Sequence, residues 1–224
     1  MVGDMSAWAG MFKDLFRQIG DGSLTAKHLE AFLGHCNPFV VPTVQMEWQQ
    51  FYHKYFRQKV EADFSRVVIP KDPGGFDRVV FIPRGLSCKQ VIVAMRKKFP
   101  AWTYWDNLDQ NVTANDRTAS RDYAIRLRDR QEADEELKNL SANQLRARGD
   151  QVIALLERLV LELKYYDETG QHLDQNNLTL CAGSRDLDGD VPGVRWRPVY
   201  GGLRVGWCSP VRADDRLRGR SVVS

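Results

Sequence analysis

Residues 191–208 read VPGVRWRPVYGGLRVGWC, and their pattern predicts the structure of the carboxy-terminal part of the chain. Apolar residues alternate with others in Val194-Arg195-Trp196-Arg197 and again in Leu203–Cys208. Because successive side chains of a strand point to opposite faces, this period of two predicts two strands, each with one packed face and one free face. Gly201-Gly202 lies between them and allows a hairpin turn. We expect Trp196 and Trp207 to fill the core beneath the sheet.

The tail that contains this hairpin has a biased composition. Residues 176–224 contain no Lys, Glu, Gln or Met, whereas residues 1–175 contain 36 residues of these four types. The earlier frequency would place about 10 of them in the tail. The tail nevertheless holds eight Arg and five Asp, so low polarity is not the cause. The alternative is an ordinary β-rich domain with a chance bias, since strands are poor in Lys and Glu.

The missing residue types share a property of their codons. Codons for Lys, Glu, Gln, Met and Trp all need a purine at the third base, and only Trp of these occurs in the tail. The bias therefore indicates codons whose third base is fixed while the first two bases vary. Asn codons that end in C and mutate at their adenines leave this pattern, and no Asn follows Asn177.

Fixed residues interleave with these biased positions, and their pattern resembles the carboxy-terminal variable region of diversity-generating retroelement target proteins. The resemblance is carried by Gly183-Ser184-Arg185, Asp188-Gly189, Val191-Pro192, Val194, Trp196, Val205, Trp207, Pro210, Asp215, Leu217-Arg218 and Arg220. Residues 123–139 and 178–184 are similar to segments of uncharacterised proteins of this type from archaeal and candidate-phylum bacterial elements. The resemblance covers residues 105–224 well and the amino-terminal part weakly.

The resemblance implies a fold and a function. Known members display varied side chains on a C-type lectin fold, and an error-prone reverse transcriptase writes the variation into the gene. We therefore expect non-catalytic ligand binding through a hypervariable surface, with no cofactor and no metal. The expected ligand-binding residues are Asp186, Asp190, Gly193, Arg195, Arg197, Val199, Tyr200, Arg204, Gly206, Cys208, Ser209, Val211, Arg212, Ala213, Asp214 and Arg216. The expected scaffold residues are Val194, Trp196, Val205, Trp207 and Leu217, together with Arg218 and Arg220.

The rest of the chain predicts an α+β protein with mixed helices and small antiparallel sheets, preceded by a helical amino-terminal region. Apolar spacing predicts helices over 5–19, 25–34 and 44–59, the last with an aromatic stripe that we interpret as core. Two strands are expected at 65–70 and 77–83, and a third at 123–128. Ser87 with Gln90, and Ser141 with Gln144, form capping boxes that open helices, and a long helix is expected over 152–168.

These patterns divide the chain into three parts. Residues 1–63 form a helical amino-terminal region. Residues 64–104 form a strand–strand–helix segment, and one option is that this segment is part of the amino-terminal region. Residues 105–224 form the lectin-like domain, with its variable region at about 181–221. Cys36, Cys88, Cys181 and Cys208 are too widely spaced for a zinc motif or a disulfide framework.

The sequence also contains residue clusters that resemble other kinds of site. The run Asp186–Asp190 has carboxylates for calcium but lacks EF-hand spacing. The carboxylates between Glu132 and Glu136 are interpreted as partners of Arg rather than as acid–base catalysts. No pair of Cys fits the formylglycine-forming enzymes of the same fold class, so we expect no enzyme. An invariant lectin-like interaction protein and a basic nucleic-acid-binding module remain the alternatives.

The charge and hydropathy of the chain bear on its partners. The formal net charge is +3, and the tail supplies all of it. This excess is too small to indicate nucleic acid by itself, so we expect a protein or other macromolecular ligand that differs between variants. No apolar run is long enough to span a membrane, and residues 1–20 suggest an amphipathic helix rather than a signal peptide. We expect synthesis in the cytoplasm, with a virion or the cell surface as possible destinations.

Overall fold

The computed structural model describes residues 5–34 and 43–224 and divides the chain into two units, Met1–Thr43 and Val44–Ser224. The first unit contains α1 (Met5–Gly20) and α2 (Ala26–Leu33), as the apolar spacing predicted. Thr25 caps α2, because its side chain accepts a hydrogen bond from the backbone N–H of His28. The helix ends at Leu33 with Gly34 as its C-cap, in agreement with the predicted end at residue 34, whereas Cys36 lies outside the described residues.

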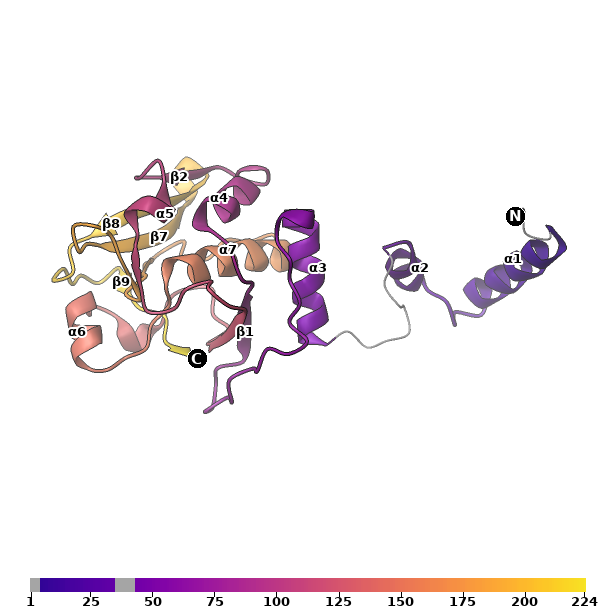
Figure 1. Ribbon diagram of the computed structural model, residues 1–224, viewed down its shortest axis with the longest axis horizontal. Coiled ribbons are helices and arrows are strands. Elements are labelled where there is room, and N and C mark those ends of the chain that lie inside the picture. The colour runs from indigo at the N-terminus through magenta and orange to yellow at the C-terminus, as the bar shows by residue number, and fades with distance from the viewer. Residues whose placement is uncertain (1–4, 35–42) are drawn as a thin grey trace. The chain divides into compact units, whose positions relative to one another are not determined.

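The second unit combines helices with small sheets, so the predicted α+β class is confirmed (Figure 1). Its helices are α3 (Val44–Phe56), α4 (Cys88–Arg96), α5 (Leu108–Asn111), α6 (Ala142–Ala147) and α7 (Leu155–Thr169), with 3-10 helices η1 (Arg57–Lys59), η2 (Glu135–Leu137) and η3 (Pro198–Tyr200). Its strands are β1 (Arg78–Ile82), β2 (Ala101–Thr103), β3 (Ala114–Asn115), β4 (Tyr123–Leu127), β5 (Leu178–Leu180), β6 (Ser184–Arg185), β7 (Val191–Arg197), β8 (Gly202–Cys208), β9 (Leu217–Arg218) and β10 (Val222–Val223).

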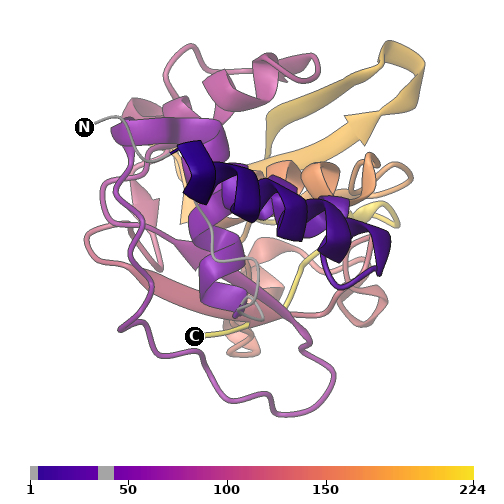
Figure 2. The same ribbon diagram turned by 90° about the vertical axis from the view of Figure 1, so that its right-hand side faces the viewer.

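The strands of the described residues form three sheets. Their orders are β1-β4-β10, β2-β8-β7-β5-β9 and β3-β6. The predicted hairpin is confirmed as the antiparallel pair β7–β8, in which Val194 lies opposite Val205. Figure 2 shows its two long strands in light orange at the upper right. On one side β8 pairs in parallel with β2, so the hairpin lies inside its sheet.

The core of this unit lies around α7, which contacts α4 and β1 (Figure 1). Leu155, Leu159 and Leu163 of α7 are fully buried. Both capping boxes are confirmed, at Ser87 before α4 and at Ser141 before α6. The helix α7 begins at Leu155 rather than at 152, because Val152 forms a β-bridge with Ser221.

The third helix belongs to the second unit rather than to a region that ends at residue 63. Its aromatic stripe is core, as expected, because Trp48, Phe51 and Tyr52 are buried against the residues of α4, α7 and β1. The Tyr52 hydroxyl donates a hydrogen bond to the carbonyl of Phe81 in β1 at 2.6 Å. These contacts place the boundary between the units before Val44.

The expected strand over 65–70 is wrong. These residues carry no strand assignment, whereas the partner run forms β1. Pro70 has no N–H to contribute to a ladder. Its carbonyl instead accepts a hydrogen bond from Arg126 Nε at 2.6 Å, and the second Arg126 contact goes to the carbonyl of Phe76. The side chain of one arginine therefore holds this segment beside β4.

Candidate ligand-binding surface

The free face of the β7–β8 hairpin gathers arginine side chains. The register places Arg195 opposite Arg204 and Gly193 opposite Gly206. The neighbouring strand β2 adds Trp102 beside Arg204. On the opposite face, buried side chains anchor the hairpin to the core, and these are Val194, Leu203 and Val205. The alternation in the sequence thus separates a packed face from an exposed face.

These side chains surround a hollow of about 370 Å³, here called the arginine hollow. It is lined by Trp102, Leu178, Gly193, Arg195, Arg197, Tyr200, Arg204, Gly206 and Trp207. The space above Gly206 is open, because a Cβ built there would meet no atom within 4 Å. Gly206 therefore keeps its part of the hollow free of side chains, whereas the Leu178 side chain covers Gly193, where a built Cβ would lie 2.8 Å from Leu178 Cδ2.

Guanidinium groups cover the aromatic rings of the hollow. The Cζ atom of Arg204 lies 4.8 Å from the centroid of the Trp102 ring and 5.3 Å from that of Tyr200. Arg197 Cζ lies 5.1 Å from the same Tyr200 ring. Such contacts contribute roughly 0.5–1 kcal/mol each at exposed sites. They hold two arginines in place while leaving their N–H groups available.

The arginines of the hollow lack carboxylate partners. Throughout residues 5–34 and 43–224, no salt bridge joins Arg195, Arg197 or Arg204 to an acid. Arg195 Nε is buried without a hydrogen-bond acceptor, and such an unsatisfied donor costs about 1–3 kcal/mol. Burial lowers the pKa of Arg195, and the charges of Arg197 and Arg216 lower it further. This surface therefore has an unbalanced positive charge.

The other predicted binding residues lie apart from this hollow. Asp190 and Ser209 are half-buried, and Val199, Val211, Ala213 and Arg216 are exposed. Arg212 pairs with Asp214, with Arg212 Nη2 2.8 Å from Asp214 Oδ2. Asp186 is buried, and its Oδ1 accepts hydrogen bonds from the backbone N–H groups of Asp188 and Asp190. That carboxylate stabilises its own loop.

Cys208 lies on the free face of the hairpin, as the alternation predicted, but it is buried there rather than exposed for ligand binding. Its exposed fraction is 4 %, because α6 and η2 cover this end of the hairpin with Leu145 and Leu137 in a second core cluster. The alternation assigned Cys208 to the free face correctly, but that face is covered at Val191 and Cys208. Burial raises the pKa of the Cys208 thiol to about 11, so it is protonated at neutral pH.

The scaffold residues differ in how far they are buried. Val194, Val205 and Leu217 are core residues, as expected. Trp196 is half-buried and stacks on His172, with ring centroids 3.3 Å apart. The prediction that Trp207 fills the core is wrong, since its exposed fraction is 47 %. It lies opposite Pro192 near the end of the hairpin and contacts the Tyr104 ring at 6.1 Å instead.

A buried ion network lies below the hairpin. Asp174 Oδ2 accepts a hydrogen bond from Arg158 Nη2 at 2.7 Å, and Asp174 Oδ1 accepts one from Arg220 Nη2 at 2.7 Å. The backbone carbonyl of Asp174 accepts a hydrogen bond from the N–H of Trp196. Arg158 also pairs with Glu162, whose second oxygen contacts His172 Nδ1 at 2.9 Å. The network therefore connects α7 with β7 and with the end of the chain.

Sequence reasoning missed several members of this site. Trp102 and Leu178 line the hollow from outside the expected variable region, and Asp174 supports it from below. Trp102 belongs to an aromatic run that the sequence shows plainly, but nothing in its spacing indicates that β2 pairs with β8. The carboxylates of 132–136 are mostly partners of Arg, as expected, in the pairs Arg128–Asp134, Arg130–Glu136 and Arg218–Glu135.

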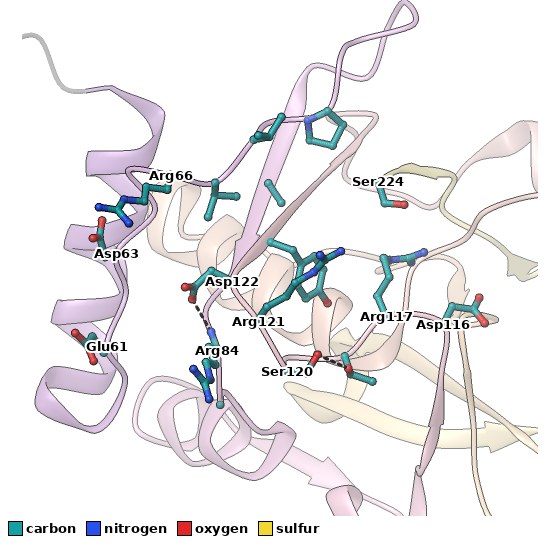
Figure 3. Close-up of a pocket in the computed structure, with 17 residues that line it drawn as sticks. Glu61, Asp63, Arg66, Arg84, Asp116, Arg117, Ser120, Arg121, Asp122 and Ser224 are labelled. Atoms are coloured by element: carbon teal, nitrogen blue, oxygen red, sulfur yellow. Dashed lines mark hydrogen bonds between the residues drawn. The ribbon is translucent and has the colours of Figure 1, made fainter.

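A second and larger hollow, of about 1720 Å³, lies beside β4 (Figure 3). Both signs of charge line it, including Arg66, Arg121, Glu61 and Asp63. The backbone N–H of Arg84 donates a hydrogen bond to Asp122 Oδ1 at 2.7 Å (Figure 3). Arg117, which also lines this hollow, forms an ion pair with the buried carboxylate of Glu157, and Arg117 Nε lies 2.7 Å from Glu157 Oε1. This balance of charges does not favour one class of ligand.

Searches for similar proteins and for metal or membrane features add little. A scan against models of protein families found no match, and neither did searches of curated proteins and of solved structures. Within the described residues, no three His, Cys, Asp or Glu side chains are grouped to hold a metal ion. Cys88, Cys181 and Cys208 are buried free thiols. None of the helices in the described parts is both long and apolar enough to cross a membrane.

Proposed function

We propose that this protein binds a ligand, without catalysis, through the exposed face of the β7–β8 hairpin and the adjoining loops. In this proposal the second unit has a C-type lectin fold, and a retroelement diversifies the exposed residues. One observation carries the proposal. The biased positions Arg195, Arg197, Tyr200, Arg204 and Gly206 surround one hollow, whereas the fixed positions Val194 and Val205 lie in the core beneath it.

Packing explains why such a surface tolerates change. Substitutions at exposed positions usually change the free energy of unfolding by no more than about 0.5 kcal/mol. Truncation of a buried aliphatic side chain costs about 2–5 kcal/mol. Strand pairing uses backbone groups, so the hairpin keeps its register when the side chains of its free face change. A binding surface of this type varies its chemistry without losing its fold.

The coding sequence of the tail tests diversification directly. We expect C at the third base of the codons for Arg195, Arg204 and the other proposed binding residues. A neighbouring reverse transcriptase gene should accompany a near-copy of the tail's coding sequence with adenines at those codons. Sequencing the locus in many members of one population measures this. An invariant tail with no template copy, or substitutions spread evenly over core and surface codons, would contradict diversification by a retroelement.

Two display libraries test the surface. One randomises Arg195, Arg197, Tyr200 and Arg204, and the matched library randomises Val194, Leu203 and Val205. Most members of the first library should keep a free energy of unfolding within about 1 kcal/mol of the parent, because their side chains lie on the exposed face. Most members of the second should lose about 2–5 kcal/mol per truncated residue. Protease resistance on the display surface measures both.

The same libraries test binding. Selection of the first library against unrelated proteins should yield binders whose enriched residues lie at the four randomised positions. Equal loss of folding in the two libraries, or a folded first library that yields no binders, would contradict the proposal. We expect ligands to differ between variants, so selections against different targets should enrich different residues at these four positions.

A further inference from the structure

The arginine hollow contains donors that the protein itself does not satisfy. Arg195, Arg197 and Arg204 face one space of about 370 Å³, and the described residues provide none of them with a carboxylate. Arg195 Nε is buried and unbonded. Another tail arginine, Arg212, is matched by Asp214. The positive charge of the hollow is therefore left for a ligand.

We propose that the hollow of this chain binds a carboxylate side chain of an acidic protein segment, with an apolar residue beside it. This inference rests on the proposed function and names the ligand class of the same surface. The guanidinium group presents paired N–H donors that match the two oxygens of a carboxylate. Arg195 and Arg204 are directly opposite in the β7–β8 register, so one carboxylate inserted between them meets donors from both strands.

The middle of the hollow suits a side chain of modest size. Gly206 leaves space beside the arginines, because no atom lies within 4 Å of a Cβ built on it, whereas the Leu178 side chain covers its cross-strand partner Gly193. The Leu178 side chain forms an apolar wall at Gly193, and Trp207 also lines the hollow. A glutamate or aspartate carboxylate with a neighbouring apolar group matches both the charged and the apolar lining.

The lining argues against a nucleic acid as the ligand. Single-stranded nucleic acid binds by stacking its bases on open aromatic faces. Here Arg204 covers Trp102 and Tyr200, and Arg197 also covers Tyr200, so these rings already have cationic partners. A phosphate backbone also brings no apolar group for Leu178. Protein therefore fits this hollow better than DNA or RNA.

Two residues that line the hollow lie outside the region that we expect to vary. Trp102 and Leu178 lie before the expected variable region, at about 181–221, yet both line the hollow. Trp102 holds Arg204 at 4.8 Å in this variant. In other variants the same indole meets whatever residue occupies position 204. Trp102 is therefore a constant element of the binding surface.

The test uses the full chain and three probes. The first is a peptide of about ten residues with a central glutamate-valine-glutamate, the second is its glutamine twin, and the third is an oligothymidylate of about ten nucleotides. Isothermal titration or fluorescence anisotropy measures binding. The acidic peptide should bind at least about tenfold more tightly than its glutamine twin and than the oligothymidylate.

Variants locate the binding. Gly206→Phe fills the open space and should weaken binding of the acidic peptide at least about tenfold. Arg195→Met should do the same by removing the buried donor. The matched control Val93→Phe adds a ring to an exposed position of α4 outside the hollow and should leave affinity unchanged. Circular dichroism and thermal melting verify that each variant folds.

Several outcomes would overturn the inference. They are equal binding of the glutamine twin, absence of acidic-peptide binding, tighter binding of the oligothymidylate, or binding that Gly206→Phe leaves intact. The library experiment separates this failure from failure of the proposed function. If selected ligands bind through the hollow but show no preference for acidic segments, only the ligand class is wrong. If the first library yields no binders, the proposed function fails as well.

Discussion

Replacement of Asp174 by Asn is expected to lower the free energy of unfolding by about 3–5 kcal/mol. Asp174 is completely buried and accepts hydrogen bonds from both Arg158 and Arg220, which are themselves buried. Removal of its charge leaves two guanidinium groups in the core with Glu162 as their remaining ion partner. Chemical denaturation of the purified variant measures the loss.

A surface pair in the same chain provides the control. Asp214 pairs with the exposed Arg212, and such surface pairs contribute about 0–1 kcal/mol. Asp214→Asn should therefore change the free energy of unfolding by less than about 1 kcal/mol. If Asp174→Asn lowers the free energy of unfolding no more than Asp214→Asn does, the buried network does not stabilise the hairpin as its geometry indicates.

The Asp174 effect should depend on pH. Burial by itself raises the pKa of Asp174, but the charges of Arg220 and Arg158 outweigh burial, and the pKa in the folded protein lies below 3.8. A lowered folded pKa contributes stability that is complete above the unfolded value of about 3.9 and is lost as the pH falls through the folded value. The difference in stability between the parent and Asp174→Asn should therefore be constant near neutral pH and narrow below about pH 4.

Trp48→Ala is expected to lower the free energy of unfolding by about 3–5 kcal/mol. The Trp48 side chain is almost fully buried in α3, with its ring centroid 5.3 Å from Phe51 and 6.1 Å from Phe81 in β1. Lys164 of α7 lies over the same ring, with its Nζ 5.4 Å from the centroid. Truncation leaves a cavity between three elements of the second unit.

Trp102→Ala is the matched control for Trp48. Trp102 is also a tryptophan of the second unit, but its side chain is exposed on β2. Its loss removes the contact with Arg204 and should cost less than about 1 kcal/mol. A small effect at Trp48 would contradict the assignment of α3 to the core and favour a boundary near residue 63.

The sequence predicts the hairpin well because its information is local. Strand alternation predicts that Val194 is packed and Arg195 is free, and Gly201-Gly202 predicts the turn. The structure agrees with both predictions. Capping boxes are likewise local, which is why Ser87 and Ser141 are placed correctly. These patterns depend on neighbours within a few residues, so a single chain contains all the information they require.

The parts that failed depend on distant segments. Cys208 is buried because Leu145 of α6 and Leu137 of η2 pack with it, whereas Trp207, on the other face of β8, is exposed. Asp174 pairs with Arg220, 46 residues further along the chain. Trp102 reaches the hollow through the parallel pairing of β2 with β8. No periodicity indicates which of many charged or aromatic residues will meet across such separations.

The position of the hairpin within its sheet has a consequence for the population of variants. Both β7 and β8 are interior strands, flanked by β5 and by β2, and the sheet ends at β2 and β9. Unpaired edge strands are where folded proteins aggregate, because their free N–H and C=O groups template further chains. Under the proposed diversification, new residues enter strands whose backbone groups are already paired. Even strongly β-forming substitutions then add no new edge, so solubility can stay nearly constant while recognition changes.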